Sequence, residues 1–293
     1  MLKLENIARS FGDRPVLREI SFEVPRGALT GFVGANGAGK TTTMRIIMGL
    51  LTAHAGRVTL DGKELWQTTR PNFGYMPEER GLYPRQPVID QLVYLGALHG
   101  LSRPVARSRA MELLERFGLA DRAKAKLDSL SLGNQQRVQV TAALLHEPEV
   151  LVLDEPFSGL DPLAVDAMSS ILHDYAARGV PILFSSHQLD LLESLVENVV
   201  IIQDGGIVAS GSADRLRAQH ATMHRLVLDG DTGWLRQTPG VETLDIAGHE
   251  ALLRFASDQV AQQVLAQALQ RGSVHEFSLQ RPSLADIYRE VIR

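Results

Sequence analysis

The chain has 293 residues, and 44% of them are hydrophobic, enough for one large globular domain or for one with a smaller companion. A formal net charge of -4 gives no sign of a protein that binds nucleic acid through bulk positive charge, so we expect no nucleic-acid partner. Cysteine is absent, which excludes disulfides, thiolate metal sites and cysteine nucleophiles.

We expect neither a signal peptide nor a membrane-spanning segment. The first residues, Met1–Arg9, alternate apolar and polar side chains and carry charges, unlike the apolar centre of a signal peptide. No window approaches the ~18 apolar residues that a transmembrane helix needs. If the protein acts at a membrane, we therefore expect it to dock on a partner there.

The first third of the chain has the pattern of short strands joined by tight turns. The predicted strands, which are rich in β-branched and apolar residues, are Leu2–Ala8, Leu17–Val24, Ala28–Val33 and Arg57–Leu60. The third strand runs into a glycine-rich loop, Gly34–Lys40, and a helix is predicted over Thr41–Gly49. A strand, a glycine loop and a helix in this order are typical of a phosphate-binding unit.

The spacing of apolar residues changes between about Val88 and Pro148. An amphipathic helix is indicated by the apolar residues Met111, Leu113, Leu114, Phe117 and Leu119. A second helix is predicted over Val138–Leu145. We interpret residues 88–148 as a helical subdomain inserted into an α/β chain.

Strand character returns in two continuous apolar runs, Val150–Leu153 and Pro181–Ser185, as expected for parallel strands buried on both faces. Between them, Asp161 and Pro162 predict the start of a helix, with Asp as the N-cap and Pro at the first helical position. We expect an α/β phosphate-loop core with an antiparallel β subdomain, extending over residues 1–212.

Residues 213–293 have a pattern of their own and are interpreted as a small C-terminal α+β accessory domain. The predicted elements are strand Met223–Leu228, short helix Gly233–Gln237, strands Val241–Ile246 and Ala251–Phe255, helix Asp258–Gln270, strand Ser273–Leu279 and helix Ser283–Ile292. This β-α-β-β-α-β order with a final helix suggests a ferredoxin-like unit. Two roles stay open for it: a stabilising appendage, such as a dimer contact, or a regulatory domain.

The glycine-rich loop matches the phosphate-loop pattern G-x-x-x-x-G-K-S/T. Small residues let backbone N–H groups turn toward phosphate oxygens, and the following helix directs its positive end at the same anion. Lys40 can reach the β- and γ-phosphates, and the Thr41 hydroxyl can ligate Mg²⁺. The alternative is a glycine-rich turn with a chance lysine, but the strand before and the helix after favour phosphate binding. The predicted nucleotide-binding residues here are Gly34, Asn36, Gly37, Gly39, Lys40, Thr41 and Thr42.

Two acidic residues, Asp154 and Glu155, follow the apolar strand Val150–Leu153. In a phosphate-loop protein, an aspartate at such a strand end holds Mg²⁺ through its water shell. Alternation along a strand directs neighbouring side chains differently, so Glu155 can polarise an attacking water. An ordinary acidic strand end is the alternative. Together with the phosphate loop, the pair predicts a nucleotide site that binds Mg²⁺ and polarises an attacking water.

At this point the chain resembles the ATP-binding cassette (ABC) family, because Leu130–Arg137 reads LSLGNQQR. The segment is similar to the family signature LSGGQ, which other phosphate-loop proteins lack and which stands at the start of a helix. Leu132 replaces a glycine and Asn134 replaces a glutamine, whereas Ser131 and Gly133 are retained. The resemblance implies that Ser131 and Gly133 face the γ-phosphate bound by the opposite subunit.

Other residues match the family in chain order. Phe11 stands where an aromatic ring stacks on adenine, and His187 stands where a switch histidine contacts the γ-phosphate. Ser158–Asp161 resembles the subunit-contact loop, and Asp161 is assigned to the nucleotide site on that basis. Glu78 stands where the family usually has glutamine, and the resemblance assigns it to catalysis and Mg²⁺ ligation. A carboxylate there can ligate Mg²⁺ but repels γ-phosphate.

The resemblance covers residues 1–212. The whole chain, including Glu78–Tyr83 and Pro282–Tyr288, is similar to ATPase subunits of bacterial exporters, among them sodium-extrusion systems. It implies an ATPase that binds ATP and Mg²⁺, pairs with a second cassette as a homodimer, and drives transport, in this subgroup export, through a separately encoded membrane permease. Such a subunit is cytoplasmic and peripheral on the inner face of the cell membrane.

Three alternatives to a transporter subunit remain. The first is a soluble ABC ATPase acting on nucleic acid or ribosomes, although such proteins often carry two cassettes or long coiled-coil inserts, and neither is visible. The second is a phosphate-loop kinase or GTPase, which the signature segment and His187 disfavour. The third is a regulatory binder that does not hydrolyse ATP, which the presence of Glu155 disfavours.

Overall fold

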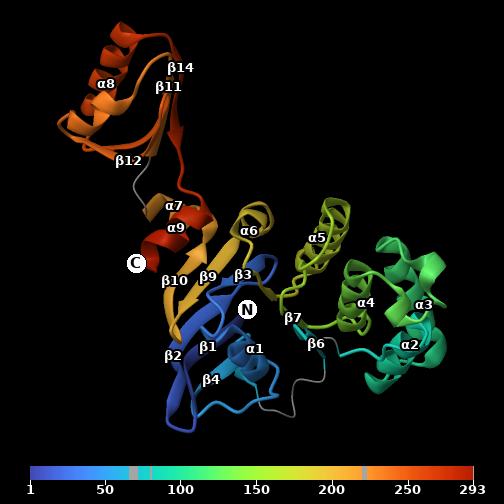
Figure 1. Ribbon diagram of the computed structural model, residues 1–293. Coiled ribbons are helices and arrows are strands. Elements are labelled where there is room, and N and C mark those ends of the chain that lie inside the picture. The colour runs from blue at the N-terminus through green and yellow to red at the C-terminus, as the bar shows by residue number, and fades with distance from the viewer. Residues whose placement is uncertain (66–71, 80, 220–222, 293) are drawn as a thin grey trace. The chain divides into compact units, whose positions relative to one another are not determined.

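The computed structural model in Figure 1 describes residues 1–65, 72–79, 81–219 and 223–292. The chain forms two compact units, Met1–Ala213 and Asp214–Val291. Each unit has a buried apolar cluster of its own. Arg80, inside the segment Glu78–Tyr83, and Arg293, in the predicted accessory domain, lie outside the described residues.

The first unit is built on a six-stranded sheet. Its strands are β3 (Leu29–Val33), β6 (Phe73–Met76), β7 (Val150–Leu153), β8 (Ile182–Ser185), β9 (Asn198–Gln203) and β10 (Gly206–Ser212). They lie in the order β10-β9-β3-β8-β7-β6, and all pairs are parallel except β9 with β10. Every residue of β3, β7 and β8 is buried, as predicted for strands covered on both faces. The carboxyl ends of these strands meet at one edge of the sheet, where the predicted site residues follow.

The predicted antiparallel subdomain is a second sheet in the same unit. It contains β1 (Leu2–Phe11), β2 (Arg14–Val24), β4 (Ala55–Leu60) and β5 (Lys63–Glu64), in the order β2-β1-β4-β5. Its apolar face shares one core with the large sheet and with helix α1 (Lys40–Ile47). The rings of Phe22 and Phe32, for example, have centroids 5.4 Å apart. This shared core holds the β1–β2 hairpin beside the phosphate loop.

The helical insert consists of α2 (Val88–Leu98), α3 (Arg103–Arg116) and α4 (Leu132–Leu144), with 3-10 turns at Ala120–Arg122 and Leu127–Ser129. Figure 1 shows α2 and α3 together in green. Helices α5 (Pro162–Ala177) and α6 (Leu189–Leu195) complete the unit. As predicted, α5 begins with Asp161 as N-cap, whose carboxylate accepts the Ala164 N–H at 2.8 Å.

The structure differs from the predicted elements in two places. Phe117 and Leu119 lie beyond α3, because the helix ends at Gly118, which has a left-handed conformation (φ 67°). The N–H of Gly118 donates to Glu115 C=O, and the N–H of Leu119 donates to Leu114 C=O. Both apolar side chains are nevertheless buried. The strand β6 (Phe73–Met76) was not among the predicted strands. It contains Gly74, which is a packing requirement, since a Cβ there would lie 2.3 Å from Ala143 O.

The second unit is an antiparallel sheet covered by one helix. Its strands are β11 (Met223–Leu228), β12 (Val241–Ala247), β13 (Glu250–Phe255) and β14 (Val274–Gln280), in the order β12-β13-β11-β14. Helix α8 (Asp258–Arg271) buries Val264 and Ala268 against the sheet. The first helix of the predicted order is a 3-10 turn, Gly233–Gln237, and α7 (Ala213–Gln219) and α9 (Leu284–Val291) complete the unit. Across the described residues of both units, no helix is long and apolar enough to span a bilayer.

Candidate nucleotide-binding and hydrolysis site

The phosphate loop connects β3 to α1, and its glycines are dictated by space and by backbone conformation. A Cβ on Gly34 would lie 2.4 Å from Ile202 O, closer than any side chain tolerates. Gly37 (φ 82°) and Gly39 (φ 113°) adopt left-handed conformations that other residues rarely take. Because α1 begins directly after Gly39, its first unpaired N–H groups and its positive dipole end are directed at the loop.

Lys40 lies inside this loop, with only 8% of its surface exposed. Its ammonium group donates to Gly34 O at 2.6 Å and to Ala35 O at 3.3 Å. A buried ammonium requires such partners, because losing its hydration without them is costly. The loop therefore holds a buried positive charge at the N-terminus of α1, an arrangement that suits a phosphate group.

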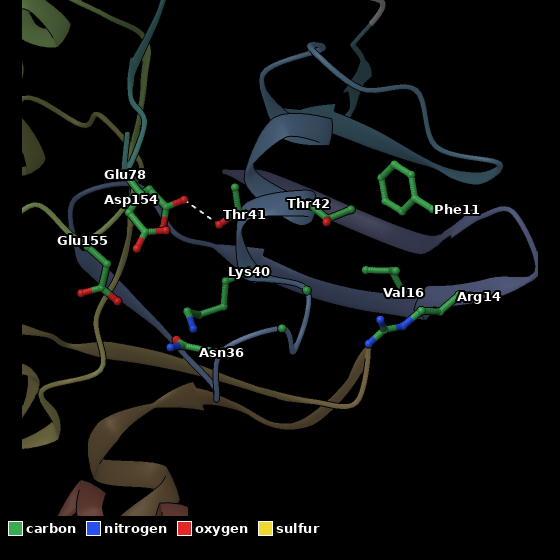
Figure 2. Close-up of a pocket in the computed structure, with 12 residues that line it drawn as sticks. Phe11, Arg14, Val16, Asn36, Lys40, Thr41, Thr42, Glu78, Asp154 and Glu155 are labelled. Carbon is green, nitrogen blue, oxygen red and sulfur yellow. Dashed lines mark hydrogen bonds between the residues drawn. The ribbon is translucent and has the colours of Figure 1, made fainter. Parts of the chain in front are cut away.

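Asp154 joins three elements at the end of the large sheet. One carboxylate oxygen accepts the Thr41 hydroxyl at 2.8 Å, drawn as a dashed line in Figure 2, and the other accepts the Ser185 hydroxyl at 2.6 Å. Thr41 belongs to α1, Ser185 ends β8, and Asp154 follows β7. Asp154 is 1% exposed, so these bonds hold its carboxylate in one orientation.

Glu155 is held by its backbone and leaves its carboxylate for chemistry. Its N–H donates to Ser185 Oγ at 2.8 Å, and its C=O accepts Gln136 Nε2 at 2.8 Å. Its φ of 53° is unusual for a residue with a side chain and marks a strained position. His187 Nδ1 lies 2.9 Å from Glu155 Oε2. Burial raises the pKa of Glu155, with His187 and then Lys40 acting in the opposite direction, and a raised pKa makes the carboxylate a stronger base.

These groups open onto a pocket of about 550 Å³. Figure 2 shows Glu78, Asp154 and Glu155 toward one end of it and Phe11 toward the other, with Lys40 between. Phe11 is 49% exposed, and the guanidinium of Arg9 lies over its ring at 5.0 Å from the centroid. The predicted residues that line the pocket are Phe11, Asn36, Gly37, Gly39, Lys40, Thr41, Thr42, Glu78, Asp154 and Glu155.

Five predicted residues are not among those that line this pocket: Gly34, Ser131, Gly133, Asp161 and His187. Ser131 is the N-cap of α4 and accepts the Asn134 N–H at 3.4 Å. Asp161 caps α5, and its carboxylate lies 3.9 Å from the guanidinium of Arg137. Two of the five are connected to the pocket through residues that line it. Gly34 accepts a hydrogen bond from Lys40, and His187 is bonded to Glu155.

Sequence reasoning missed four residues that shape the site. Arg14 and Val16 line the pocket. They could have been identified from the alternation of strand β2, which begins at Arg14 and directs every second side chain to the same face as Phe11. Ser185 is a polar residue ending an apolar strand, the same signal that identified Asp154. Gln136 gave no signal beyond its place in the signature segment, because its contact with Glu155 depends on how α4 packs beside the end of β7.

Comparison with known proteins assigns the family. A family model described as "ABC transporter" matches residues 17–158, and one described as "ATP-binding protein DrrA1-3-like, C-terminal domain" matches residues 211–292. The chain is 37% identical over 296 residues to YhaQ of Bacillus subtilis, an uncharacterized ABC transporter ATP-binding protein, covering 100% of this chain and 98% of that one. The chain belongs to the ABC transporter family. This ABC protein is also 31% identical over 301 residues to the linearmycin resistance ATP-binding protein LnrL of Bacillus subtilis, covering 98% and 97% of the two chains.

Solved structures agree with this assignment. An ATP-binding subunit of an ABC transporter superposes with a TM-score of 0.69 at 33% identity, covering 75% of this ABC protein and 92% of that chain. A cassette in its ADP conformation gives a TM-score of 0.64 at 25% identity. The predicted phosphate-loop α/β fold is thereby confirmed. The protein is an ATP-binding, ATP-hydrolysing subunit of an ABC transporter, and the alternative of a nucleic-acid or ribosome ATPase gains no support.

Proposed function

We propose that this pocket binds ATP, with the base at Phe11 and the terminal phosphate toward Glu78. We further propose that Glu155 is the general base of hydrolysis. Phe11 offers an exposed ring for the base, and the loop with Lys40 offers amides and a positive charge for the phosphates. The observation that carries the proposal is a chain of hydrogen bonds that runs from Thr41 through Asp154 and Ser185 to the backbone of Glu155. It joins the phosphate loop to a carboxylate with a raised pKa.

The donors beside this series fit Mg²⁺. Thr41 and Asp154 supply a hydroxyl and a carboxylate that already lie 2.8 Å apart, and Glu78 adds a second carboxylate to the same pocket. Oxygen ligands of this kind are those that Mg²⁺ prefers, with phosphate oxygens completing its shell. When bound, Mg²⁺ neutralises charge on the β- and γ-phosphates. Thr41, Asp154 and Glu78 would hold it, and Glu155 then orients the attacking water while His187 positions the Glu155 carboxylate.

The position of the signature segment supports a homodimer in which each site takes Ser131 and Gly133 from the partner. Neither residue lines the pocket of its own chain. They stand at the N-terminus of α4, whose unpaired amides suit an anion. Leu132, between them, is 60% exposed, and Leu163, which follows the Ser158–Asp161 loop, is 80% exposed. Exposed leucines on both segments are consistent with a surface that a second cassette covers.

A separately encoded membrane permease is the proposed partner, with this subunit peripheral on the cytoplasmic face. The full-length match to relatives named as transporter ATP-binding proteins supports this arrangement. One of these relatives is named for linearmycin resistance, which favours export as the direction of transport. Purification of the native complex from membranes in mild detergent identifies the permease, and recovery of the chain on ribosomes or DNA would contradict the proposal.

Mixed dimers test the shared site directly. Ser131→Arg fills the anion site of α4, and Lys40→Ala removes the loop cation, so we expect each variant alone to be inactive. A mixed dimer of the two retains one complete site, and an equal mixture should recover about a quarter of wild-type ATPase activity if subunits pair at random. The double variant mixed with Lys40→Ala is the control and should recover none. Full activity of Ser131→Arg alone, or no recovery in the mixture, would refute the shared site.

A further inference from the structure

Arg14 occupies a defined place in the nucleotide pocket. Strands β1 and β2 are joined by the two-residue turn Gly12–Asp13, in which Gly12 has a φ of 56°. This turn pairs Phe11 directly with Arg14. Opposite residues of an antiparallel pair project from the same face, and Val16 follows two residues later on that face. All three side chains consequently line the pocket.

The guanidinium of Arg14 is unengaged in the part of the chain that the structure describes. The side chain is exposed, and within the described residues it forms no hydrogen bond or ion pair. The neighbouring Arg9 differs, because it donates to Thr52 O at 2.9 Å and covers one face of the Phe11 ring. Arg9 is therefore engaged in orienting the ring, and Arg14 supplies donors that remain available to a ligand.

Charge is distributed unevenly along the pocket. Its three carboxylates, those of Glu78, Asp154 and Glu155, lie toward the end near Thr41, where Lys40 is also buried. Arg14 is the other cationic side chain among the lining residues. Figure 2 shows Val16 between the ring of Phe11 and the guanidinium of Arg14, so the guanidinium is not stacked on the ring.

We propose that Arg14 binds the α-phosphate of the nucleotide. This inference rests on the proposed function, in which the base lies on Phe11 and the terminal phosphates lie at Lys40. The α-phosphate is then the charged group between the two, and a planar guanidinium is suited to form paired, charge-assisted hydrogen bonds with its oxygens. Arg14 acts as a positioning residue that joins the base-binding end of the pocket to the phosphate loop.

A contact with the α-phosphate makes a specific prediction across nucleotides. Arg14→Gln in the full chain should lower the affinity for ATP, ADP and AMP by the same factor. We expect this factor to be about tenfold, because the loss of a charge-assisted hydrogen bond at a partly exposed site changes an affinity by roughly that amount. Adenosine binding should not change. Arg14→Lys should restore part of the affinity, because it returns the charge without the planar fork. Arg18→Gln is the matched control, removing an exposed arginine from the same strand outside the pocket.

Binding is measured by calorimetry for ATP and ADP and by competition for AMP and adenosine, with circular dichroism to verify folding. Unchanged ATP affinity in Arg14→Gln would overturn the proposal. An equal loss for adenosine would assign Arg14 to the base, and a loss restricted to ATP would assign it to the terminal phosphates; either result overturns the α-phosphate contact. Absence of nucleotide binding in the wild-type chain would instead overturn the proposed function.

Discussion

Glu155→Gln separates ATP binding from ATP hydrolysis. The backbone of residue 155 is held by Ser185 Oγ and by Gln136 Nε2, and neither bond involves the side chain. The substitution therefore removes a negative charge and a base without releasing the loop. A positioned general base contributes about 100-fold to 10,000-fold in rate, so we expect kcat to fall at least ~100-fold, a rise in the barrier of about 2.7 kcal/mol.

ATP affinity should be retained, because Lys40 and the loop amides that hold the phosphates are unchanged. The variant should accumulate as an ATP-bound dimer, which is measured by size-exclusion chromatography alongside phosphate release under single-turnover conditions. Glu149→Gln is the matched control, since Glu149 is exposed at the opposite end of β7. Hydrolysis by Glu155→Gln at a near wild-type rate would show that this carboxylate is not the base.

Three further predictions concern the same site and the accessory domain. Burial raises the pKa of Glu155, so the carboxylate is protonated and lost as a base as pH falls. In the pH profile of kcat, the midpoint of the acid limb should therefore lie above 4.5, the ordinary pKa of a glutamate. A midpoint at the ordinary value would contradict this prediction. Ser185→Ala should lower the free energy of unfolding by about 1–3 kcal/mol, measured against Ser194→Ala on the exposed face of α6, because it leaves buried partners unpaired. A fragment of residues 1–213 should bind ATP with the dissociation constant of the full chain. A large loss of ATP affinity in a fragment that still folds would place nucleotide contacts in the second unit.

Much of the site could be predicted because its motifs are local. The phosphate loop needs only a strand, small residues and a helix in immediate succession, and that succession is visible from β3 to α1. The two acids after β7 were identifiable for the same reason. A continuous apolar run predicts a buried strand, and polar residues directly after it lie where the strand leaves the sheet. The order of elements in the accessory domain followed from strand and helix periodicities.

Local sequence patterns thus define which strands, loops and helices form, whereas the packing of the fold brings particular ones together. Ser185 is 31 residues from Asp154, and their bond exists because β8 lies between β3 and β7 in the sheet. Arg14 enters the pocket because the register of a hairpin pairs it with Phe11. Position 74 requires glycine because α4 packs closely on strand β6 there and leaves no room for a side chain. Periodicity reports on a residue's neighbours within one element, whereas these contacts depend on strand order, register and packing between elements, which no local pattern encodes.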